Sequence, residues 1–160
     1  MSPESPIEER CVRNFEGLNL TLCTAESCTG GLIAHLITCI PGAANIFTGG
    51  IVAYHNSVKV RHLGVKTETL AEFGAVSEQT AREMAEGAQY AFETDYALSI
   101  TGIAGPSGGT ESKPVGLVYI GLCGPDGTRV EQHNFTGDRP EIQQQAARRA
   151  LSVACEAISK

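Results

Sequence analysis

The sequence has no excess of positive charge. Its 12 lysines and arginines are outnumbered by 18 aspartates and glutamates, which gives a net charge of −6. Proteins that bind nucleic acid non-specifically carry a basic face, so this balance argues against that class. It does not exclude a small phosphorylated ligand, because one local anion site is enough to hold one.

Long apolar runs are absent as well. No stretch approaches the roughly 20 apolar residues that span a bilayer. The first residues, Met1-Ser2-Pro3-Glu4, lack the basic and apolar regions of a signal peptide. We therefore expect a cytoplasmic protein that does not associate with membranes. The length of 160 residues and the hydrophobic fraction of 42% predict one globular domain over residues 1–160.

Metal-site and disulfide signatures are also missing. None of the 6 cysteines forms a Cys-x-x-Cys pair, and no group of cysteines and histidines has the spacing of a zinc site. Most of the cysteines sit among aliphatic residues, where a free thiol behaves as a small hydrophobic side chain. We predict reduced and mostly structural cysteines, no metal ion and no cofactor.

Helical and strand patterns alternate along most of the chain. Strands are expected over residues 18–24, 47–54, 96–100, 115–122 and 129–135, the last two as an antiparallel hairpin. Helices are expected over residues 6–18, 32–40, 58–63, 67–73, 78–92 and 138–158. Asn56 or Ser57 is the expected cap of the helix over 58–63, and Ser77 of the helix that begins at 78. This order predicts a three-layer α/β/α sandwich around a mixed five-stranded sheet.

The stretch Ala25-Glu26-Ser27-Cys28-Thr29-Gly30-Gly31 links the first strand to the following helix. Its glycines allow a sharp turn, and the first N–H groups of a helix have no intrahelical partner. The turn therefore suits a nucleophile with oxyanion donors beside it. Ser27 is the candidate, although a serine at this junction is also typical of a helix N-cap. The thiol of Cys28 is a rival, although a packed small side chain is the simpler interpretation.

A serine nucleophile needs a base, and a neutral lysine can serve. Lys59 follows the second strand, near the start of a predicted helix, where burial and the helix dipole would lower its pKa. The alternative is a solvated surface lysine. Tyr54, at the end of the same strand, could bond the lysine or relay a proton, or could simply be a core aromatic.

A glycine-rich loop, residues 101–110, follows the third strand. Successive backbone N–H groups in such a loop can point at an anion. The loop is neither a Walker A loop nor a dinucleotide-binding turn, because their glycine and lysine spacings are missing. Lys113 beside it could pair with the anion or be exposed. Since ligands bind beyond the carboxyl ends of parallel strands, we expect this loop, Ser27 and the Tyr54 region to converge on one site.

These stretches, together with Gly74-Ala75-Val76-Ser77, Lys113-Pro114-Val115-Gly116 and Gly137-Asp138-Arg139, resemble the CinA C-terminal domain family over about residues 7–158. That family includes the nicotinamide mononucleotide (NMN) amidohydrolases known as PncC. The sequence departs from it at Ala44 and His55, where relatives often have serine. It also departs at Gln143-Gln144-Gln145, where an arginine is common.

The resemblance implies a metal-independent deamidase that converts NMN to nicotinate mononucleotide and ammonia in pyridine-nucleotide salvage. It implies that Ser27 is the nucleophile, Lys59 the base and Tyr54 an assisting residue. The substrate-binding residues would be Gly30, Gly31, Thr101, Gly102, Gly105, Ser107, Gly108, Gly109 and Thr110. A homodimer is expected, as is the absence of activities that belong to the large N-terminal domain of two-domain members. The alternative is a non-catalytic nucleotide-binding or interaction module on the same fold.

Overall fold

The computed structural model describes residues 5–159 and is built on one mixed sheet of five strands. The strands are β1 (Leu22–Glu26), β2 (Phe47–Val52), β3 (Tyr96–Gly102), β4 (Leu117–Gly124) and β5 (Gly127–Asn134). Their order across the sheet is β2-β1-β3-β4-β5. β1 is parallel to β2 and β3, whereas β4 is antiparallel to β3 and β5. The predicted mixed five-stranded sheet is confirmed. The acidic start, Met1–Glu4, lies outside the described residues.

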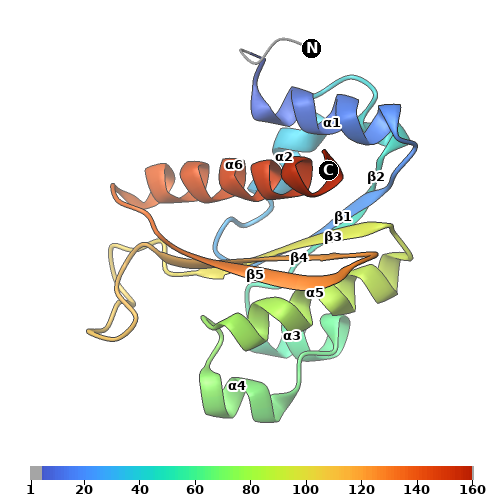
Figure 1. Cartoon of the computed structure of the whole chain (residues 1–160). Helices are drawn as coiled ribbons and strands as arrows, with labels where there is room; N and C mark the ends of the chain where they lie inside the picture. Colours follow the sequence, from blue (N-terminus) through green and yellow to red (C-terminus); the bar gives the residue numbers. More distant parts are fainter. Residues whose placement is uncertain (1–4, 160) are drawn as a thin grey trace.

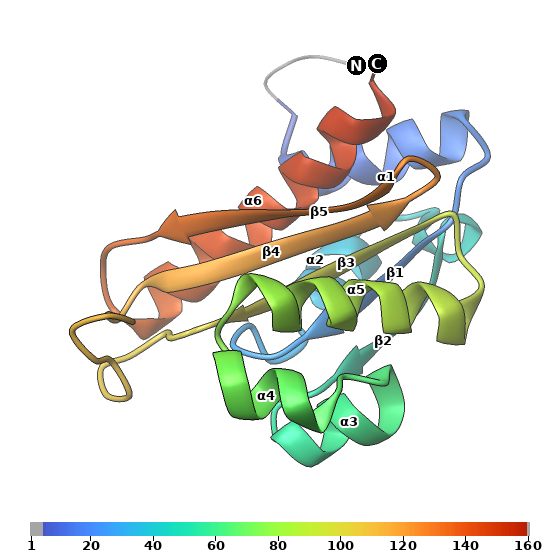
Figure 2. The same ribbon diagram turned by 60° about the horizontal axis from the view of Figure 1, so that its bottom comes forward.

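Helices cover both faces of this sheet (Figure 1). On one face lie α1 (Ile7–Gly17), α2 (Leu32–Thr38) and α6 (Arg139–Ile158); on the other lie α3 (Asn56–Leu63), α4 (Thr67–Phe73) and α5 (Glu78–Phe92). Figure 2 shows α5 in front of the strands and α6 behind them. A hydrophobic cluster fills each interlayer space, one around Phe15 and Leu151 and the other around Met84 and Leu63. The three-layer α/β/α sandwich is confirmed.

The last helix begins with a capping box. The Asp138 carboxylate accepts a hydrogen bond from the Glu141 N–H, and the Glu141 carboxylate accepts one from the Asp138 N–H. Pro140 occupies the first turn, where a missing N–H costs nothing. One face of α6 is buried against the sheet and α1, and it consists of Ile142, Ala146, Ala150, Leu151 and Ala154. Local capping therefore determines where α6 starts, and Arg139 is its first residue.

The backbones of α3 and α5 approach each other closely at Gly87. A Cβ built on Gly87 would lie only 1.7 Å from the backbone oxygen of Leu63, the last residue of α3. A backbone atom in a packed helix cannot move aside, so this position requires glycine. The contact holds in place the helix that carries Lys59.

Several expected boundaries were wrong: β2 ends at Val52 instead of Tyr54, and β5 begins at Gly127 instead of Arg129. β1 begins at Leu22 instead of Leu18, because α1 continues to Gly17 and Asn19 adopts a positive φ of 55°. β4 begins at Leu117, because Gly116 has a φ of 95° that interrupts the extended backbone. The cap of α3 is neither Asn56 nor Ser57. His55 takes that place, and its Nδ1 accepts a hydrogen bond from the Ser57 N–H at 3.1 Å. The predicted Ser77 cap is confirmed, since its hydroxyl accepts from the Thr80 N–H.

No helix within residues 5–159 is both long enough and apolar enough to cross a membrane.

Candidate active site

The carboxyl ends of the three parallel strands open into one cleft of about 350 Å³. Ser27 follows β1, Tyr54 and Lys59 follow β2, and residues 103–105 follow β3, and all of them line the cleft. Its size falls within the range of about 300–1,000 Å³ that is usual for small-molecule sites. The structure thus brings together the three stretches that the sequence predicted to converge.

Lys59 and Ser27 are in direct contact at the floor of the cleft. Lys59 is only 1% exposed, and its Nζ lies 3.1 Å from Ser27 Oγ. Nζ also contacts the backbone oxygens of Ala53 at 2.7 Å and Tyr54 at 3.3 Å. Desolvation by burial lowers the pKa of Lys59, and the nearby Cys28 only partly opposes this effect. Lys59 is therefore not a solvated surface lysine.

The three oxygen atoms around Nζ fit a neutral amine as well as an ammonium ion. An ammonium ion would donate to Ser27 Oγ and to both carbonyl oxygens. A neutral amine has two N–H donors and a lone pair, so it would donate to the carbonyls of Ala53 and Tyr54 and accept from the Ser27 hydroxyl. In this second state the serine proton already points at its acceptor, which is the geometry that general-base catalysis requires.

A buried carboxylate, Glu26, organises the turn that carries Ser27. Glu26 is 1% exposed, and its Oε1 accepts hydrogen bonds from the Thr29 hydroxyl at 2.6 Å and the Ile33 N–H at 2.8 Å. Its Oε2 accepts from the Ala34 N–H at 3.0 Å. The positive end of α2 is thus already occupied by a side chain of the protein. The sequence reasoning did not identify this role.

Ser27 itself does not cap α2. The residue at the cap position is Gly31, with a φ of 103° that disfavours residues other than glycine. The Ser27 N–H donates to the Ile100 oxygen at 3.0 Å, and the Gly30 N–H donates to the Ser27 oxygen at 3.0 Å. Within the described chain, the Cys28 N–H has no hydrogen bond to another residue, although it contacts the sulfur of its own side chain, and Cys28 borders the cleft. That N–H is a candidate donor for an oxyanion, because its residue lines the cleft beside Ser27.

The thiol of Cys28 is poorly suited to attack a substrate. Its side chain is 6% exposed, and burial raises its pKa to about 12. The neighbouring Glu26 charge raises that pKa further, while Lys59 and Arg139 oppose the rise. No histidine in residues 5–159 is recorded as a hydrogen-bond partner of its sulfur. The interpretation of Cys28 as a packed small side chain agrees with these observations.

The glycine-rich loop contributes its first part to the cleft. Its lining residues include Thr101, Gly102, Gly105, Ser107 and Gly108. The Thr101 hydroxyl donates to the Ala75 oxygen at 2.8 Å, so this side chain ties the loop to the segment before α5. Among the described residues, no acceptor is recorded for the N–H groups of Gly105, Ser107 and Gly108. These groups remain available to an anion.

The other predicted ligand residues lie outside the cleft. The Thr110 N–H donates to the Lys113 oxygen at 2.7 Å, in the outer part of the loop together with Gly109. Gly30 and Gly31 line a separate hollow between α2 and the start of α6. Lys113 does not reach the cleft either, because its Nζ donates to the Phe73 oxygen at the end of α4 at 2.5 Å. Richness in glycine did not distinguish the inner half of the loop from its outer half.

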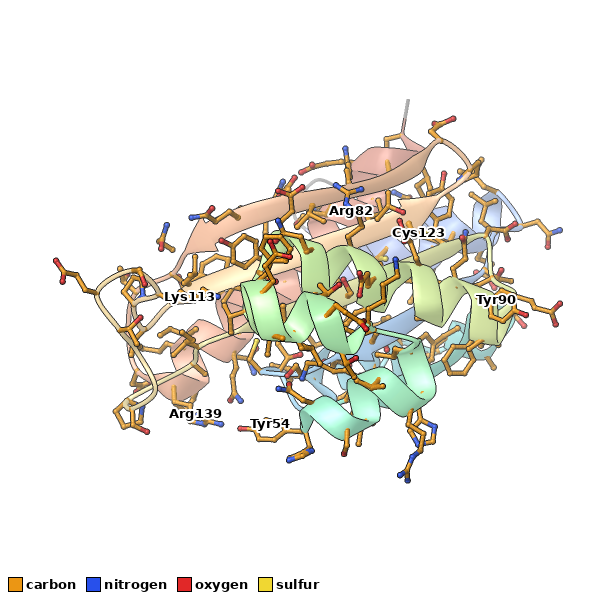
Figure 3. All side chains as sticks on the ribbon, turned by 90° about the horizontal axis from the view of Figure 1, so that it is seen from below. Tyr54, Arg82, Tyr90, Lys113, Cys123 and Arg139 are labelled. Carbon is orange, nitrogen blue, oxygen red and sulfur yellow. The ribbon has the colours of Figure 1, made fainter. Side chains whose placement is uncertain are left out.

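Arg139 joins the two sides of the cleft and was missing from the predicted site residues. Its Nη1 donates to the Gly105 oxygen at 2.8 Å, and its Nη2 donates to the Tyr54 hydroxyl at 2.9 Å. Figure 3 shows the Arg139 and Tyr54 side chains reaching toward each other from different elements. The motif Gly137-Asp138-Arg139 was the available signal, because a capped helix start fixes the position of the arginine.

Tyr54 lies beside Lys59 but directs its phenol elsewhere. Its side chain is 60% exposed at the mouth of the cleft, so it is not a core aromatic. Its backbone oxygen contacts Lys59 Nζ, whereas its phenol oxygen contacts Arg139.

Gln143, one of the positions at which the sequence departs from the family, also has a structural role, since its Nε2 donates to the Cys28 oxygen at 2.9 Å. That bond links α6 to the turn of Ser27.

No cluster of three or more metal-ligating side chains was found among the described residues. The chemical groups of the cleft are a serine hydroxyl, a buried lysine, an arginine, a phenol and a series of backbone N–H groups.

Comparisons with known proteins agree with this architecture. Residues 4–158 match the model of the CinA C-terminal domain family. A CinA-like protein from Kosmotoga olearia is 51% identical over 155 residues, which are 97% of this chain and 38% of that protein. A CinA-like protein from Thermotoga neapolitana is 47% identical over 148 residues, 92% of this chain and 36% of that protein. The chain thus spans a little over a third of the length of these relatives.

Solved structures match over the whole fold. A competence/damage inducible protein from Agrobacterium tumefaciens has a TM-score of 0.92 at 42% identity, with 100% of both chains covered. A CinA superfamily protein from Klebsiella pneumoniae has a TM-score of 0.92 at 33% identity, with 96% of both chains covered.

Proposed function

The chain belongs to the CinA C-terminal domain family, and from this membership we propose that it is an amidohydrolase that converts NMN to nicotinate mononucleotide and ammonia. The observation that carries the proposal is the contact between the buried Lys59 Nζ and Ser27 Oγ at 3.1 Å. The names of the relatives refer to competence and damage and specify no reaction. The chemistry therefore rests on the site and on the resemblance of its motifs.

In the first step Ser27 Oγ attacks the carboxamide carbon of NMN. Neutral Lys59 accepts the hydroxyl proton while its own two N–H groups remain bonded to the Ala53 and Tyr54 oxygens. Burial lowers the pKa of Lys59, and this lowering increases the fraction of the amine that is neutral near neutral pH. The negative charge that develops on the carboxamide oxygen is stabilised by backbone N–H groups, the Cys28 N–H among them.

In the second step the amide nitrogen takes the proton from Lys59 and leaves as ammonia. The acyl group remains on Ser27 Oγ as an ester of the nicotinoyl group. A water molecule then attacks the ester carbon and gives a proton to Lys59, which returns it to Ser27 as the acid product leaves. The sum is one NMN and one water consumed, with one nicotinate mononucleotide and one ammonia formed.

The phosphate of NMN binds at the opposite end of the cleft. Arg139 donates two hydrogen bonds, one to the Gly105 oxygen and one to the Tyr54 hydroxyl, and its remaining N–H donors are available to a phosphate oxygen. Gly105, Ser107 and Gly108 line the same cleft as Arg139, and the Gly105 oxygen accepts from Arg139. Tyr54 assists by holding the guanidinium and leaves proton transfer to Lys59. We place this activity in a single cytoplasmic domain.

Ammonia release from NMN by the purified protein tests the proposal. We expect turnover by the wild type and its loss in Ser27→Ala, which removes only one buried hydroxyl oxygen. Calorimetric binding of NMN by Ser27→Ala controls for folding of the site. An inactive wild type that still binds NMN would instead favour a nucleotide-binding module. A Ser27→Ala variant with the full wild-type rate would exclude the serine mechanism.

A further inference from the structure

Two thiols meet where α1 packs against α6, on the face of the sheet that both helices cover (Figure 1). Cys11 of α1 and Cys155 of α6 belong to one hydrophobic cluster, and their side chains are in hydrogen-bond contact. The cleft reaches only the start of α6, at Arg139, and the rise of a helix places Cys155 about 24 Å further along it. The proposed reaction therefore uses neither thiol, and both are free.

The two thiols have unequal surroundings. Cys11 is fully buried, whereas Cys155 is 8% exposed. The hydrogen bond with Cys155 raises the pKa of Cys11 well above its ordinary value, and burial adds to this rise. The same hydrogen bond, which the Cys11 thiol donates, lowers the pKa of Cys155; burial opposes this effect, and the charge of Arg10 supports it. Cys155 is therefore the thiol that forms a thiolate, and Cys11 is the one that keeps its proton.

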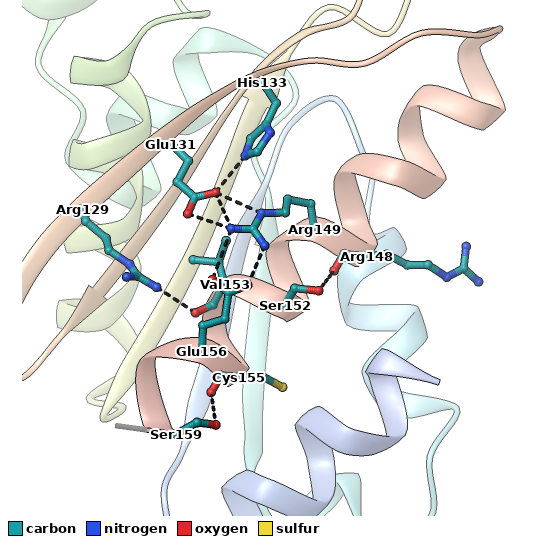
Figure 4. A network of polar contacts seen from close by, with 10 residues as sticks. All are labelled: Arg129, Glu131, His133, Arg148, Arg149, Ser152, Val153, Cys155, Glu156 and Ser159. Atoms are coloured by element: carbon teal, nitrogen blue, oxygen red, sulfur yellow. Dashed lines mark hydrogen bonds and ion pairs between the residues drawn. The ribbon is translucent and has the colours of Figure 1, made fainter. Parts of the chain in front are cut away.

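The charged groups around Cys155 favour a thiolate. Arg10 of α1 has a buried Nε for which no acceptor is recorded within residues 5–159. The carboxylate of Glu156 would repel a thiolate beside it, but it forms an ion pair with Arg149 at 2.7 Å (Figure 4). Arg149 also forms an ion pair with Glu131 of β5 at 3.0 Å. The charge of Glu156 is thus compensated, whereas the described residues offer Arg10 no recorded carboxylate partner.

We propose that Cys11 and Cys155 form a site of reversible oxidation that reacts with hydrogen peroxide and closes to a disulfide between α1 and α6. The Cys155 thiolate attacks one peroxide oxygen, the O–O bond breaks, and hydroxide leaves while Cys155 becomes a sulfenic acid. The Cys11 sulfur then attacks the Cys155 sulfur, and the thiol proton leaves with the sulfenic oxygen as water. In sum, two thiols and one peroxide give one disulfide and two waters. The thiols are oxidised and the peroxide is reduced.

The geometry distinguishes this pair from another pair of buried thiols. Cys23 of β1 and Cys123 of β4 both lie opposite Ala97, on either side of β3. Two strand spacings, about 9–10 Å, separate their backbones, which exceeds the Cα separation of about 7 Å that a disulfide can bridge. Cys11 and Cys155 are already in contact, so a small approach brings their sulfurs to the bond length of about 2.05 Å.

Peroxide treatment followed by peptide mass spectrometry without reduction tests the proposal. Trypsin places the two cysteines on separate peptides, because Arg10 and Arg13 flank Cys11 and Arg149 precedes Cys155. We expect the treated wild type to yield these peptides linked, lighter by two hydrogen atoms than their sum, and separate again after dithiothreitol. Recovery of both peptides unlinked after treatment would overturn the proposal. Ammonia release from NMN is a separate measurement, so the failure of this proposal is distinguishable from that of the proposed function.

Single variants assign the two roles. In Cys11→Ser the sulfenic acid has no thiol to condense with, so dimedone, which labels sulfenic acids, should modify Cys155. Cys155→Ser should give neither the linked peptides nor a label on Cys11. Cys123→Ser is the matched control, because it removes a buried thiol outside the pair, and it should link as the wild type does. Circular dichroism establishes that each variant is folded. A dimedone label on Cys11 in Cys155→Ser would overturn the assignment of Cys155 as the attacking thiol.

The role of Arg10 has a control on the same helix. Arg10→Met should slow the loss of the Cys155 thiol in peroxide severalfold, because the thiolate loses a favourable charge. Arg13→Met removes a guanidinium that pairs with Glu16 and should leave the rate unchanged. Equal rates in Arg10→Met and the wild type would overturn the peroxide-reactive thiolate.

Discussion

Lys59 Nζ lies 3.1 Å from Ser27 Oγ, although 32 positions separate the two residues in the chain. The parallel pairing of β1 with β2 brings about this contact, because it ends both strands at the same edge of the sheet. The Ala53 and Tyr54 carbonyls then hold the amine against the turn that follows β1. The predictions below concern the reaction, the turn that carries Ser27, the phosphate end of the cleft and the β5 edge of the sheet.

The first prediction concerns the base. Because neutral Lys59 accepts the serine proton, kcat/KM for NMN should rise with pH through the lowered pKa of Lys59 and then level off. Lys59→Met should lose this rise and fall in rate by about 10²- to 10⁴-fold. Lys113→Met, whose amine bonds the end of α4, is the control and should keep the wild-type profile. Ammonia release measured from pH 6 to about pH 10 decides the matter, and a flat wild-type profile would contradict the lysine base.

The second prediction concerns the neighbouring thiol. Cys28→Ser should retain most of the activity, because a thiol whose pKa is raised to about 12 by burial supplies almost no thiolate at neutral pH. The reactive form of a cysteine is its thiolate. Iodoacetamide at about pH 7.5 should therefore alkylate the exposed Cys39 and leave the buried Cys28 unmodified. Peptide mass spectrometry with parallel activity assays gives the measurement. Loss of activity in Cys28→Ser, in a variant that still binds NMN, would count against the serine mechanism.

The third prediction concerns Glu26. Glu26→Gln replaces one carboxylate oxygen by an NH₂ group, which cannot accept a hydrogen bond from the α2 backbone. The unsatisfied buried donor should lower the free energy of unfolding by about 1–3 kcal/mol. It should also lower kcat, because the turn that positions Ser27 shifts. Thr29→Val loses only one of the three bonds and should cost less. Urea unfolding followed by circular dichroism compares the two, and equal stability of Glu26→Gln and wild type would refute the assignment.

The fourth prediction concerns Arg139. If its guanidinium binds the phosphate, Arg139→Met should raise KM for NMN by about 10- to 100-fold, the value of one or two charge-assisted hydrogen bonds. The variant should also lose the preference for NMN over nicotinamide riboside, which lacks the phosphate. Tyr54→Phe keeps the arginine and removes only one of its contacts, so its effect on KM should be smaller. An unchanged preference in Arg139→Met would place the phosphate elsewhere.

The fifth prediction concerns stability at the β5 edge. Burial alone would raise the pKa of Glu131, but hydrogen bonds from His133 and Arg149 outweigh it and lower the pKa. A carboxylate with a lowered folded pKa stabilises the protein above its unfolded pKa of about 4.3 and loses this effect as pH falls through the folded value. Glu131→Gln should therefore be less stable than wild type by about 1 kcal/mol at pH 7. Urea unfolding at pH 7 and pH 3 should show this difference shrinking in acid; a difference independent of pH would contradict the ion pair.

The sheet and the convergence of three loops could be predicted because both follow from local patterns. The alternation of strands and helices determines which strands are parallel. Parallel strands end at the same edge of the sheet, which brings Ser27 after β1 close to Lys59 after β2. Arg139 and Glu26 were harder to identify for a physical reason. The role of Arg139 depends on where α6 starts relative to β2, and that of Glu26 on a carboxylate folding back onto α2. Neither relationship produces a periodic pattern in the sequence.

The errors in detail also have physical causes. His55 replaced the expected Asn56 or Ser57 cap, because its ring nitrogen can accept the same N–H that a serine oxygen accepts. Glycine content could not indicate that Gly109 and Thr110 lie outside the cleft, since composition does not reveal which part of a loop faces a cavity.

The close approach of α3 and α5 at Gly87 affects how the protein tolerates mutation. Any side chain at that position would collide with the Leu63 carbonyl and displace the helix that carries Lys59. A library selected only for activity should therefore show strict intolerance at Gly87, a residue that borders no part of the cleft. Evolution of new substrate preference can vary the cleft lining outside Ser27, Lys59 and Arg139, but it must also keep this backbone-to-backbone contact far from the substrate.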